Sequence, residues 1–210
     1  MTLLIEGYGC GPIETNVYLV VDPDSRHALV IDAPPDSVDL VVERVKALDV
    51  TVDALVLTHG HWDHIVDTAA IASALGVPVM AHRMAGSRVT SPDEGASPVP
   101  VAPATIDQLI DDGDTVTLGD HTFQVWHLPG HDEGHIALIS VPDDAFLGGD
   151  VLFPNGHGRT DIPGSDQAVM NHTIDRLLSL PDTMVVYPGH GATTTIGQER
   201  PWMSLMAARS

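Results

Sequence analysis

The seven residues THGHWDH, at positions 58–64, place four possible metal ligands within six residues. Thr58 ends the apolar run VDALVLT (52–58), which has the length of a strand buried on both faces, and the four possible ligands come directly after it. His59 and His61 are too close in sequence to share one helix face, but in an extended turn both can reach one ion. Asp63 and His64 can then hold a second ion. Imidazole and carboxylate are ligands of zinc, iron and manganese, so this stretch predicts a metal centre at a strand end.

Three further residues that could bind a metal also lie at a strand end, each directly after an apolar strand and a glycine. They are His131 in LPGH, Asp150 in FLGGD and His190 in YPGH. Each alone is more often a turn residue or a helix cap. Together they complete two ligand sets, in which the glycines let the backbone approach the ions. The sets are His59, His61 and His131 for one ion, and Asp63, His64 and His190 for the other, with Asp150 free to bridge.

Hydrophobic periodicity predicts strands and helices in two similar halves. The predicted strands are 16–22, 27–32, 52–58 and 77–81, then a hairpin over 115–128, then 135–141, 145–150 and 184–191. The predicted helices are 38–48, 65–75 and 166–179. Residues 86–105 contain four prolines and predict a long loop, which could cover the site. This order predicts a mixed α/β (α+β) fold in which two sheets pack together with helices outside.

Length and charge narrow the classes of partner. The chain has 210 residues, which predicts a single domain over 1–210. A net charge of −20 disfavours nucleic acid and membrane surfaces, so we expect a small-molecule substrate. The first residues do not resemble a signal peptide, and Cys10 is the only cysteine, so we expect a cytoplasmic protein. The oligomeric state is left open.

The motifs THGHWDH, PGH, GGDVLF and YPGHG, in this order, resemble those of the metallo-β-lactamase-fold hydrolases. The resemblance covers nearly the whole chain. It implies a four-layer αββα sandwich with a two-metal site at one sheet edge. It would put His59, His61 and His131 on the first metal, and Asp63, His64 and His190 on the second, with Asp150 bridging them.

Within this superfamily the chain most resembles short glyoxalase II-like hydrolases. The similar stretches are GPIETNVYLV, GHGRTDIPGSD and YPGHGATTTIGQE. The resemblance implies two divalent ions, with zinc expected and iron or manganese as alternatives. True β-lactamases are less similar, because they use a cysteine in the second metal site where this chain has Asp150. Glutathione-using members carry a Lys and a Tyr where this chain has Arg159 and Asp161, so the resemblance does not extend to glutathione.

These patterns lead us to expect a binuclear hydrolase that uses a hydroxide shared by two ions to cleave a small thioester. Asp63 and Asp150 are the expected catalytic residues. A thiolate leaves with little protonation, so a thioester is favoured over the alternative of a lactone or ester. The stretch GRTD also resembles persulfide dioxygenases, which use one iron, and this is the second alternative. A non-catalytic metal-binding protein is the third.

Weaker expectations concern residues around the ligands. In the family pattern Asp32 hydrogen-bonds the metal-site loop, although a turn residue is about as plausible. Arg159 could pair with a substrate carboxylate or form a salt bridge with Asp161. His127 and His135 are expected to be packed histidines rather than ligands.

Overall fold

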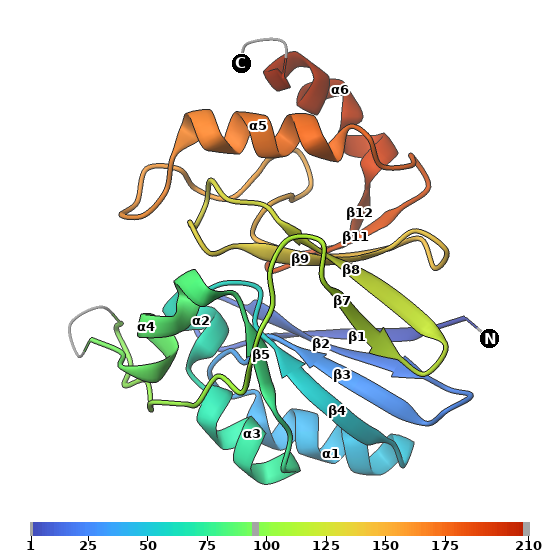
Figure 1. Cartoon of the computed structure of the whole chain (residues 1–210), viewed down its shortest axis with the longest axis vertical. Helices are drawn as coiled ribbons and strands as arrows, with labels where there is room; N and C mark the ends of the chain where they lie inside the picture. Colours follow the sequence, from blue (N-terminus) through green and yellow to red (C-terminus); the bar gives the residue numbers. More distant parts are fainter. Residues whose placement is uncertain (1, 94–96, 208–210) are drawn as a thin grey trace.

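The computed structural model describes residues 2–93 and 97–207. Two six-stranded mixed sheets face each other, and helices cover the outer face of each (Figure 1). The first sheet contains, in spatial order, β1 (Leu4–Cys10), β2 (Thr15–Asp22), β3 (His27–Ile31), β4 (Thr51–Val56), β5 (Val79–Ala81) and β6 (Gln108–Leu109). The second contains β12 (Thr194–Thr195), β11 (Val185–Pro188), β10 (Ala145–Gly149), β9 (Ile136–Ser140), β8 (His121–His127) and β7 (Thr115–Leu118). The expected αββα sandwich is confirmed.

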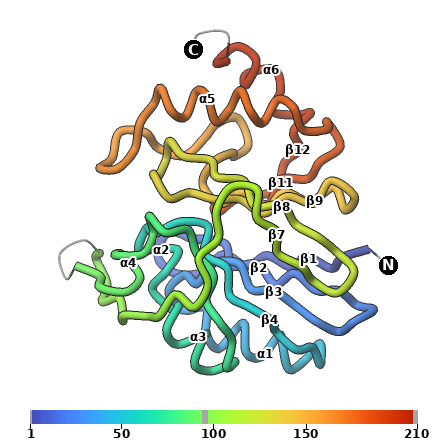
Figure 2. The backbone as a smooth tube through the Cα atoms, viewed as in Figure 1, coloured from blue at the N-terminus to red at the C-terminus, as the bar shows by residue number. Residues whose placement is uncertain are grey.

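The outer layers are formed by two helix pairs. Helices α1 (Val38–Leu48) and α3 (Thr68–Leu75) cover the first sheet, and α5 (Gln167–Leu177) and α6 (Ile196–Ala207) cover the second (Figure 1). Three short helical segments, α2 (Trp62–Ile65), the 3₁₀ turn η1 (Arg83–Ala85) and α4 (Gly86–Thr90), connect the strands. The ribbon of Figure 1 and the tube of Figure 2 both show α2 and α4 at the same end of the sandwich.

Strand alternation explains why the core has three layers. In β2, Tyr18 and Val20 face the second sheet, while Val17 and Leu19 belong to the layer beneath α1 and α3. Phe123 of β8 joins the layer between the sheets. Because successive side chains of a strand point to opposite faces, a strand buried on both sides needs apolar residues at every position. The continuous apolar runs of the sequence are therefore central strands.

The topology brings the ligand motifs together. Strands β4, β8, β10 and β11 are each followed immediately by one of these motifs, and β10 runs parallel to β11. A bridge between Thr15 and His190 joins the two sheets at this end. Carboxyl ends of parallel strands share one sheet edge, which is where α/β folds place their sites.

Two parts of the chain differ from the prediction. The segment predicted as a loop over 86–105 begins with α4, because its prolines start only at Pro92; residues 94–96 of it lie outside the described part. The helix predicted over 65–75 begins at Trp62 and is interrupted after Ile65. There the carbonyl of His64 accepts from Ala33 N instead of continuing the helix. The pattern also missed β1, β6, β12 and α6.

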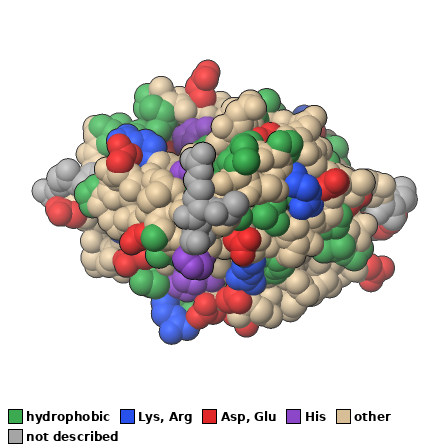
Figure 3. Space-filling view, turned by 90° about the horizontal axis from the view of Figure 1, so that it is seen from above, with side chains coloured by type: hydrophobic (Ala, Val, Ile, Leu, Met, Phe, Trp, Pro, Cys, Tyr) green, Lys and Arg blue, Asp and Glu red, His purple; other side chains and the backbone are tan. Residues whose placement is uncertain are grey.

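The surface of the described residues is strongly acidic. On the face shown in Figure 3, the few Lys and Arg side chains lie beside acidic ones. Such pairs include Arg200 with Asp182 and Arg176 with Asp112. Among the described residues, no helix is both long and apolar enough to cross a membrane.

Candidate metal centre

Three histidines converge at the end of the sandwich, and we refer to His59, His61 and His131 as the first cluster. His61 Nδ1 lies 3.0 Å from His59 Nε2 and 2.9 Å from His131 Nε2. The His61 ring stands nearly perpendicular to the other two, at 82° and 89°. Three nitrogens therefore point at one volume from different directions, which is the arrangement that a tetrahedral cation needs.

Asp63, His64 and His190 form a neighbouring group, referred to as the second cluster. Asp63 Oδ2 lies 3.3 Å from the Nε2 atoms of both His64 and His190. Asp63 and His64 lie on α2, whose single turn presents them to the strand end that carries His190. Thr15 Oγ1 donates to Asp63 Oδ2 at 2.9 Å and holds this carboxylate in place.

Asp150 lies between the two clusters. Its Oδ1 atom is 3.4 Å from His64 Nε2, and its Oδ2 atom is 3.4 Å from His131 Nε2 and 3.5 Å from His190 Nε2. Gly189 makes this position possible, because a Cβ there would overlap Asp150 Oδ1. The structure thus brings all seven expected ligands together and puts one carboxylate beside both clusters.

Each histidine of the two clusters faces a second partner with the nitrogen that points away from the centre. The contacts are His59 Nδ1 with Thr58 Oγ1 (3.0 Å), His61 Nε2 with Asp132 (3.6 Å), His64 Nδ1 with Asp32 (2.8 Å), His131 Nδ1 with the Arg159 carbonyl (2.8 Å) and His190 Nδ1 with the Ile13 carbonyl (3.2 Å). Such partners fix the tautomer and the ring orientation of a metal-binding histidine. The inward nitrogens therefore face the volume in which a cation would bind.

A cation fits the residues that are present. His64 Nε2 and Asp150 Oδ1 are fully buried atoms without a hydrogen-bond partner among the described residues. Buried polar atoms are normally paired, and leaving one unpaired costs about 1–3 kcal/mol. A divalent ion between the two atoms would satisfy both of them. Histidine nitrogens with carboxylate oxygens suit zinc, iron or manganese.

The two clusters differ in electrostatics. Burial and the neighbouring imidazoles lower the pKa of His59 well below its ordinary value and lower the pKa of His61 to about 4. Burial also acts on His64, but the charges of Asp32 and Asp150 outweigh it and raise the pKa of His64. Contacts with Asp150 and Asp63 likewise outweigh burial and raise the pKa of His190 to about 9. His59 and His61 are therefore neutral at pH 7, and the second cluster holds protons that a cation would replace.

Asp32 supports both the loop and one ligand. It accepts from Thr58 N at 2.7 Å, from Thr58 Oγ1 at 2.9 Å and from His64 Nδ1 at 2.8 Å. It is buried at the end of β3. Arg159 and Asp161 instead form an exposed ion pair, with Nε–Oδ1 at 2.8 Å. The backbone of Arg159 contacts His131, while its guanidinium lies at the edge of the cavity described next.

A cavity of about 1190 Å³ opens directly over both clusters. Its floor includes His61, Asp63, His131, Asp150 and His190. Its walls combine apolar side chains with two guanidinium groups, and come from several separate segments: Ile13, Trp62, Arg88, Val101, Phe153, Arg159 and Ile162. Part of the segment 86–105 thus forms a wall of the cavity, as the sequence allowed.

Sequence reasoning missed two residues near the first cluster. Asp132 is completely buried, and Arg88 of α4 donates to it. The stretch HDEGH placed Asp132 between two histidines, which was the available signal. Nothing in the sequence around Arg88 indicated a role. His135 is also fully buried; it stacks on His59 at 4.9 Å and accepts from Asp150 N through Nε2, as a packed histidine rather than a ligand.

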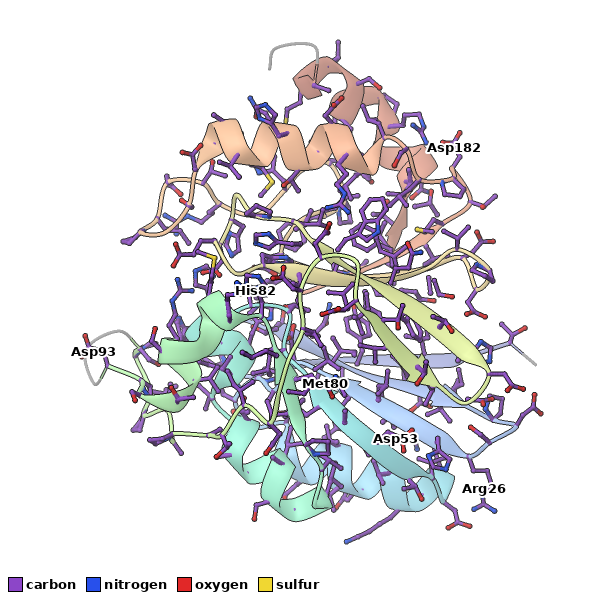
Figure 4. All side chains as sticks on the ribbon, viewed as in Figure 1. Arg26, Asp53, Met80, His82, Asp93 and Asp182 are labelled. Carbon is purple, nitrogen blue, oxygen red and sulfur yellow. The ribbon has the colours of Figure 1, made fainter. Side chains whose placement is uncertain are left out.

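A third group, His82, Asp111 and His127, is less suited to a cation. The rings of His82 and His127 stack at 4.4 Å with an interplanar angle of 15°. Lone pairs of imidazoles lie in the ring plane, so those of stacked rings run parallel instead of converging. His82, labelled between the two sheets in Figure 4, also uses Nδ1 to accept from Met84 N. This group packs the two sheets together outside the candidate centre.

Comparison with known proteins identifies the family. A model of the metallo-beta-lactamase superfamily matches residues 10–190. Hydroxyacylglutathione hydrolase GloC of Haemophilus influenzae is 33% identical over 196 residues, covering 89% of this chain and 90% of that protein. The chain therefore belongs to the metallo-beta-lactamase superfamily of metallo-hydrolases.

Solved structures agree with this assignment. The BLEG-1 B3 metallo-beta-lactamase superposes with a TM-score of 0.88 and 31% identity, covering 97% of this chain and 99% of that one. ETHE1 from Myxococcus xanthus gives a TM-score of 0.81 and 28% identity over 99% of this chain and 86% of that one. TTHA1623, in a di-iron-bound form, gives a TM-score of 0.76 and 32% identity, covering 91% of this chain and 95% of that one.

Proposed function

We propose that this protein is a binuclear metal-dependent hydrolase that cleaves a small thioester. The observation that carries the proposal is the position of Asp150, whose two oxygens face His64 on one side and His131 and His190 on the other. A carboxylate in that position favours two ions over one. We propose zinc as the metal, with iron or manganese as alternatives; the di-iron form of TTHA1623 supports testing iron.

The roles of the side chains follow from their contacts. The six residues of the two clusters, together with Asp150, would hold two divalent ions. When bound, such a pair supplies a nucleophilic hydroxide near neutral pH and stabilises the oxyanion of a tetrahedral intermediate. Asp63 and Asp150 lie on the cavity floor, where their carboxylates can orient the attacking group and accept its proton. Burial raises the pKa of Asp63, but His190 and His64 outweigh burial and bring it to about 2, so Asp63 is ionised at neutral pH.

The cavity suits a small, partly apolar substrate with an anionic group. Trp62, Phe153 and Ile162 offer apolar surface, and Arg159 offers a guanidinium whose ion pair with Asp161 is exposed. A thiolate leaves without a dedicated general acid, since thiols have a pKa near 8.5. The similarity to GloC of Haemophilus influenzae supports a thioester. We further propose a small molecule as the partner and the cytoplasm as the location.

A persulfide dioxygenase with one iron is the second candidate. Its support is the stretch GRTD, whose Arg159 lines the cavity and pairs with Asp161, and the similarity to ETHE1 from Myxococcus xanthus. A lactone or ester hydrolase would use the same clusters with a different leaving group. A non-catalytic metal-binding protein is disfavoured, because all seven ligand positions are filled.

The test combines metal content with substrate specificity. Protein purified without chelator is analysed for zinc, iron and manganese, and assayed on thioesters, lactones, a β-lactam and a persulfide, with oxygen uptake recorded. Two ions per chain and thioester turnover without oxygen uptake would support the proposal. One iron per chain with persulfide-dependent oxygen uptake would replace it by the dioxygenase. Two ions with turnover of the lactone or β-lactam alone would overturn the thioester assignment.

A matched pair of variants links turnover to the centre. Asp150→Asn removes the charge between the clusters, so we expect at most one ion per chain and a loss of activity above about a hundredfold. Asp182→Asn removes an exposed carboxylate that pairs with Arg200, and we expect it to leave both quantities unchanged. Full activity of Asp150→Asn would contradict a binuclear mechanism.

A further inference from the structure

The segment that follows β5 places the guanidinium of Arg88 against a buried carboxylate, that of Asp132, beside the first cluster. Arg88 lies on α4 and donates through Nη1 to Asp132 Oδ2. Asp132 is completely buried, and its other oxygen accepts from Gly134 N at 2.8 Å. The Arg88 side chain is 31% exposed and lines the cavity. A buried carboxylate needs such a partner, because an uncompensated charge in the interior is strongly destabilising.

The same oxygen of Asp132 also faces His61. Asp132 Oδ2 lies 3.6 Å from His61 Nε2, on the side of the ring opposite to the first cluster. His61 Nδ1 points the other way, to His59 and His131. At 3.6 Å the contact is longer than a hydrogen bond, so it acts through charge. Asp132 Oδ2 is thus shared between a guanidinium and the outward nitrogen of His61.

Close packing fixes this arrangement on both ligand loops. A Cβ added at Gly60, between His59 and His61, would lie 3.2 Å from Cδ of Arg88. One added at Gly134 would lie 2.8 Å from the backbone nitrogen of Ala85. Both distances are tighter than ordinary van der Waals contact. The segment formed by η1 and α4 therefore packs directly against the loops that carry the first cluster.

We propose that the Arg88–Asp132 ion pair is a positioning device for His61, which sets the metal affinity of the first cluster. Arg88 holds Asp132 Oδ2 at 3.6 Å from His61 Nε2. At this distance the carboxylate attracts Nε2 and so keeps Nδ1 of His61 facing inward. The distance is also long enough that the ring is not pulled out of the first cluster. Without Arg88, His61 Nε2 would be the remaining nitrogen that faces Asp132 Oδ2 among the described residues, and the ring would turn toward the carboxylate. This proposal rests on the metal site of the proposed function, but not on its substrate.

The competing explanation is that the pair merely stabilises the fold. Four variants separate the two: Arg88→Met, Asp132→Asn, the double variant, and Arg88→Lys, which keeps the charge. Arg83→Met is the matched control, since Arg83 lies in the same segment and forms an exposed pair with Asp111. Zinc affinity is measured by competition with a chelator, cobalt(II) absorption reports the coordination, and the melting temperature is recorded on metal-free protein.

We expect Arg88→Met and Asp132→Asn each to weaken binding of the first ion by roughly 10–100-fold and to alter the cobalt spectrum. Arg88→Lys should retain most of the affinity, and Arg83→Met all of it. The double variant should regain the melting temperature lost by Arg88→Met, because no uncompensated buried charge remains. Its zinc affinity should stay low.

Recovery of both stability and zinc affinity in the double variant would overturn the proposal, as would unchanged affinity in both single variants. These outcomes are independent of turnover. If the unmodified protein binds two ions but cleaves no thioester, the proposed function fails and the role of Arg88 stands. If the unmodified protein binds no zinc or cobalt, both fail together.

Discussion

Asn16 of the first sheet donates its backbone N–H to the carbonyl of Gly189 in the second sheet, at 2.7 Å and directly beside His190. Its side-chain amide donates to the carbonyls of Pro188 at 2.9 Å and Gly191 at 3.0 Å. One residue from β2 therefore holds three carbonyls, those of residues 188, 189 and 191, on both sides of His190 in the second cluster. The separation of the two sheets and the position of His190 are set by the same contacts.

Asn16→Ala tests this connection. The backbone bond remains, but two carbonyls lose a buried donor, so we expect a loss of about 1–3 kcal/mol in the free energy of unfolding. We also expect the second ion to bind about tenfold more weakly, with the first ion unaffected. Denaturant titration and chelator competition measure the two effects. Asn171→Ala is the control, because Asn171 is a partly buried asparagine on the outer helix α5; equal effects in the two variants would contradict the prediction.

Asp32→Asn should weaken metal binding through His64. Thr58 N donates to Oδ1 of Asp32, whereas the Thr58 hydroxyl and His64 Nδ1 share Oδ2, so the NH₂ group of an asparagine would face either Thr58 N–H or both of the other donors. Either orientation breaks a contact that holds the Thr58 loop or His64 in place, and we expect metal affinity to fall by roughly 10–100-fold. The control is Asp67→Asn, since Asp67 also accepts from a backbone N–H, that of Ser37, but away from the centre. Unchanged zinc affinity in Asp32→Asn would show that Asp32 does not orient His64.

Metal binding should release protons from the second cluster only. The pKa of His64 is raised and that of His190 is about 9, so both rings are protonated at pH 7 in the metal-free protein. Coordination requires neutral imidazole, so filling this cluster should release about two protons, with affinity rising about tenfold per pH unit for each proton. Calorimetry in buffers of different ionisation enthalpy counts them. An ion bound by the first cluster should displace no proton from His59 or His61, because both are already neutral at pH 7; equal proton release from the two clusters would refute this.

The metal-free protein should be most stable near pH 6.5. The pKa of His61 falls to about 4 and that of His135 to about 3, and His59 shifts in the same direction. Below pH 6.5 the unfolded chain binds protons that the folded chain does not, so each residue removes about 1.4 kcal/mol per pH unit. Above pH 6.5 the opposite shifts act: the stability contributed by His64 and His190 is lost as the pH rises through their raised pKa values, that of His190 being about 9.

Melting temperatures from pH 4 to 10 test this profile. A maximum in the metal-free protein, with a fall on both sides, is the expected result. In the metal-saturated protein the alkaline fall should flatten, because cations take the place of the protons on the second cluster. A flat profile in the metal-free protein between pH 5 and 9 would contradict the assigned shifts.

The sequence by itself determined the candidate metal-binding residues and the layer architecture, because both are encoded locally. A stretch of strand buried on both faces is apolar, as in residues 17–21 of β2 and 54–56 of β4, and a polar residue that follows such a strand lies at a sheet end. The N-cap of α5 is equally local, because Asp166 accepts from Val169 N, three residues further along the chain. These signals need only neighbours in the chain.

Tertiary structure decided what depends on which distant segments meet. The helix predicted over 65–75 is broken because Ala33 takes the carbonyl of His64, and Arg88 gains its role only where α4 reaches Asp132. Helix α4 has five residues, too few for a periodic pattern to reveal it. Each of the seven candidate metal-binding residues could be recognised from its own stretch of sequence. The placement of Asp150 between the two clusters, however, arises from the strand order. Hydrogen bonds and ion pairs between remote segments leave no local pattern, since either partner alone is an ordinary polar residue.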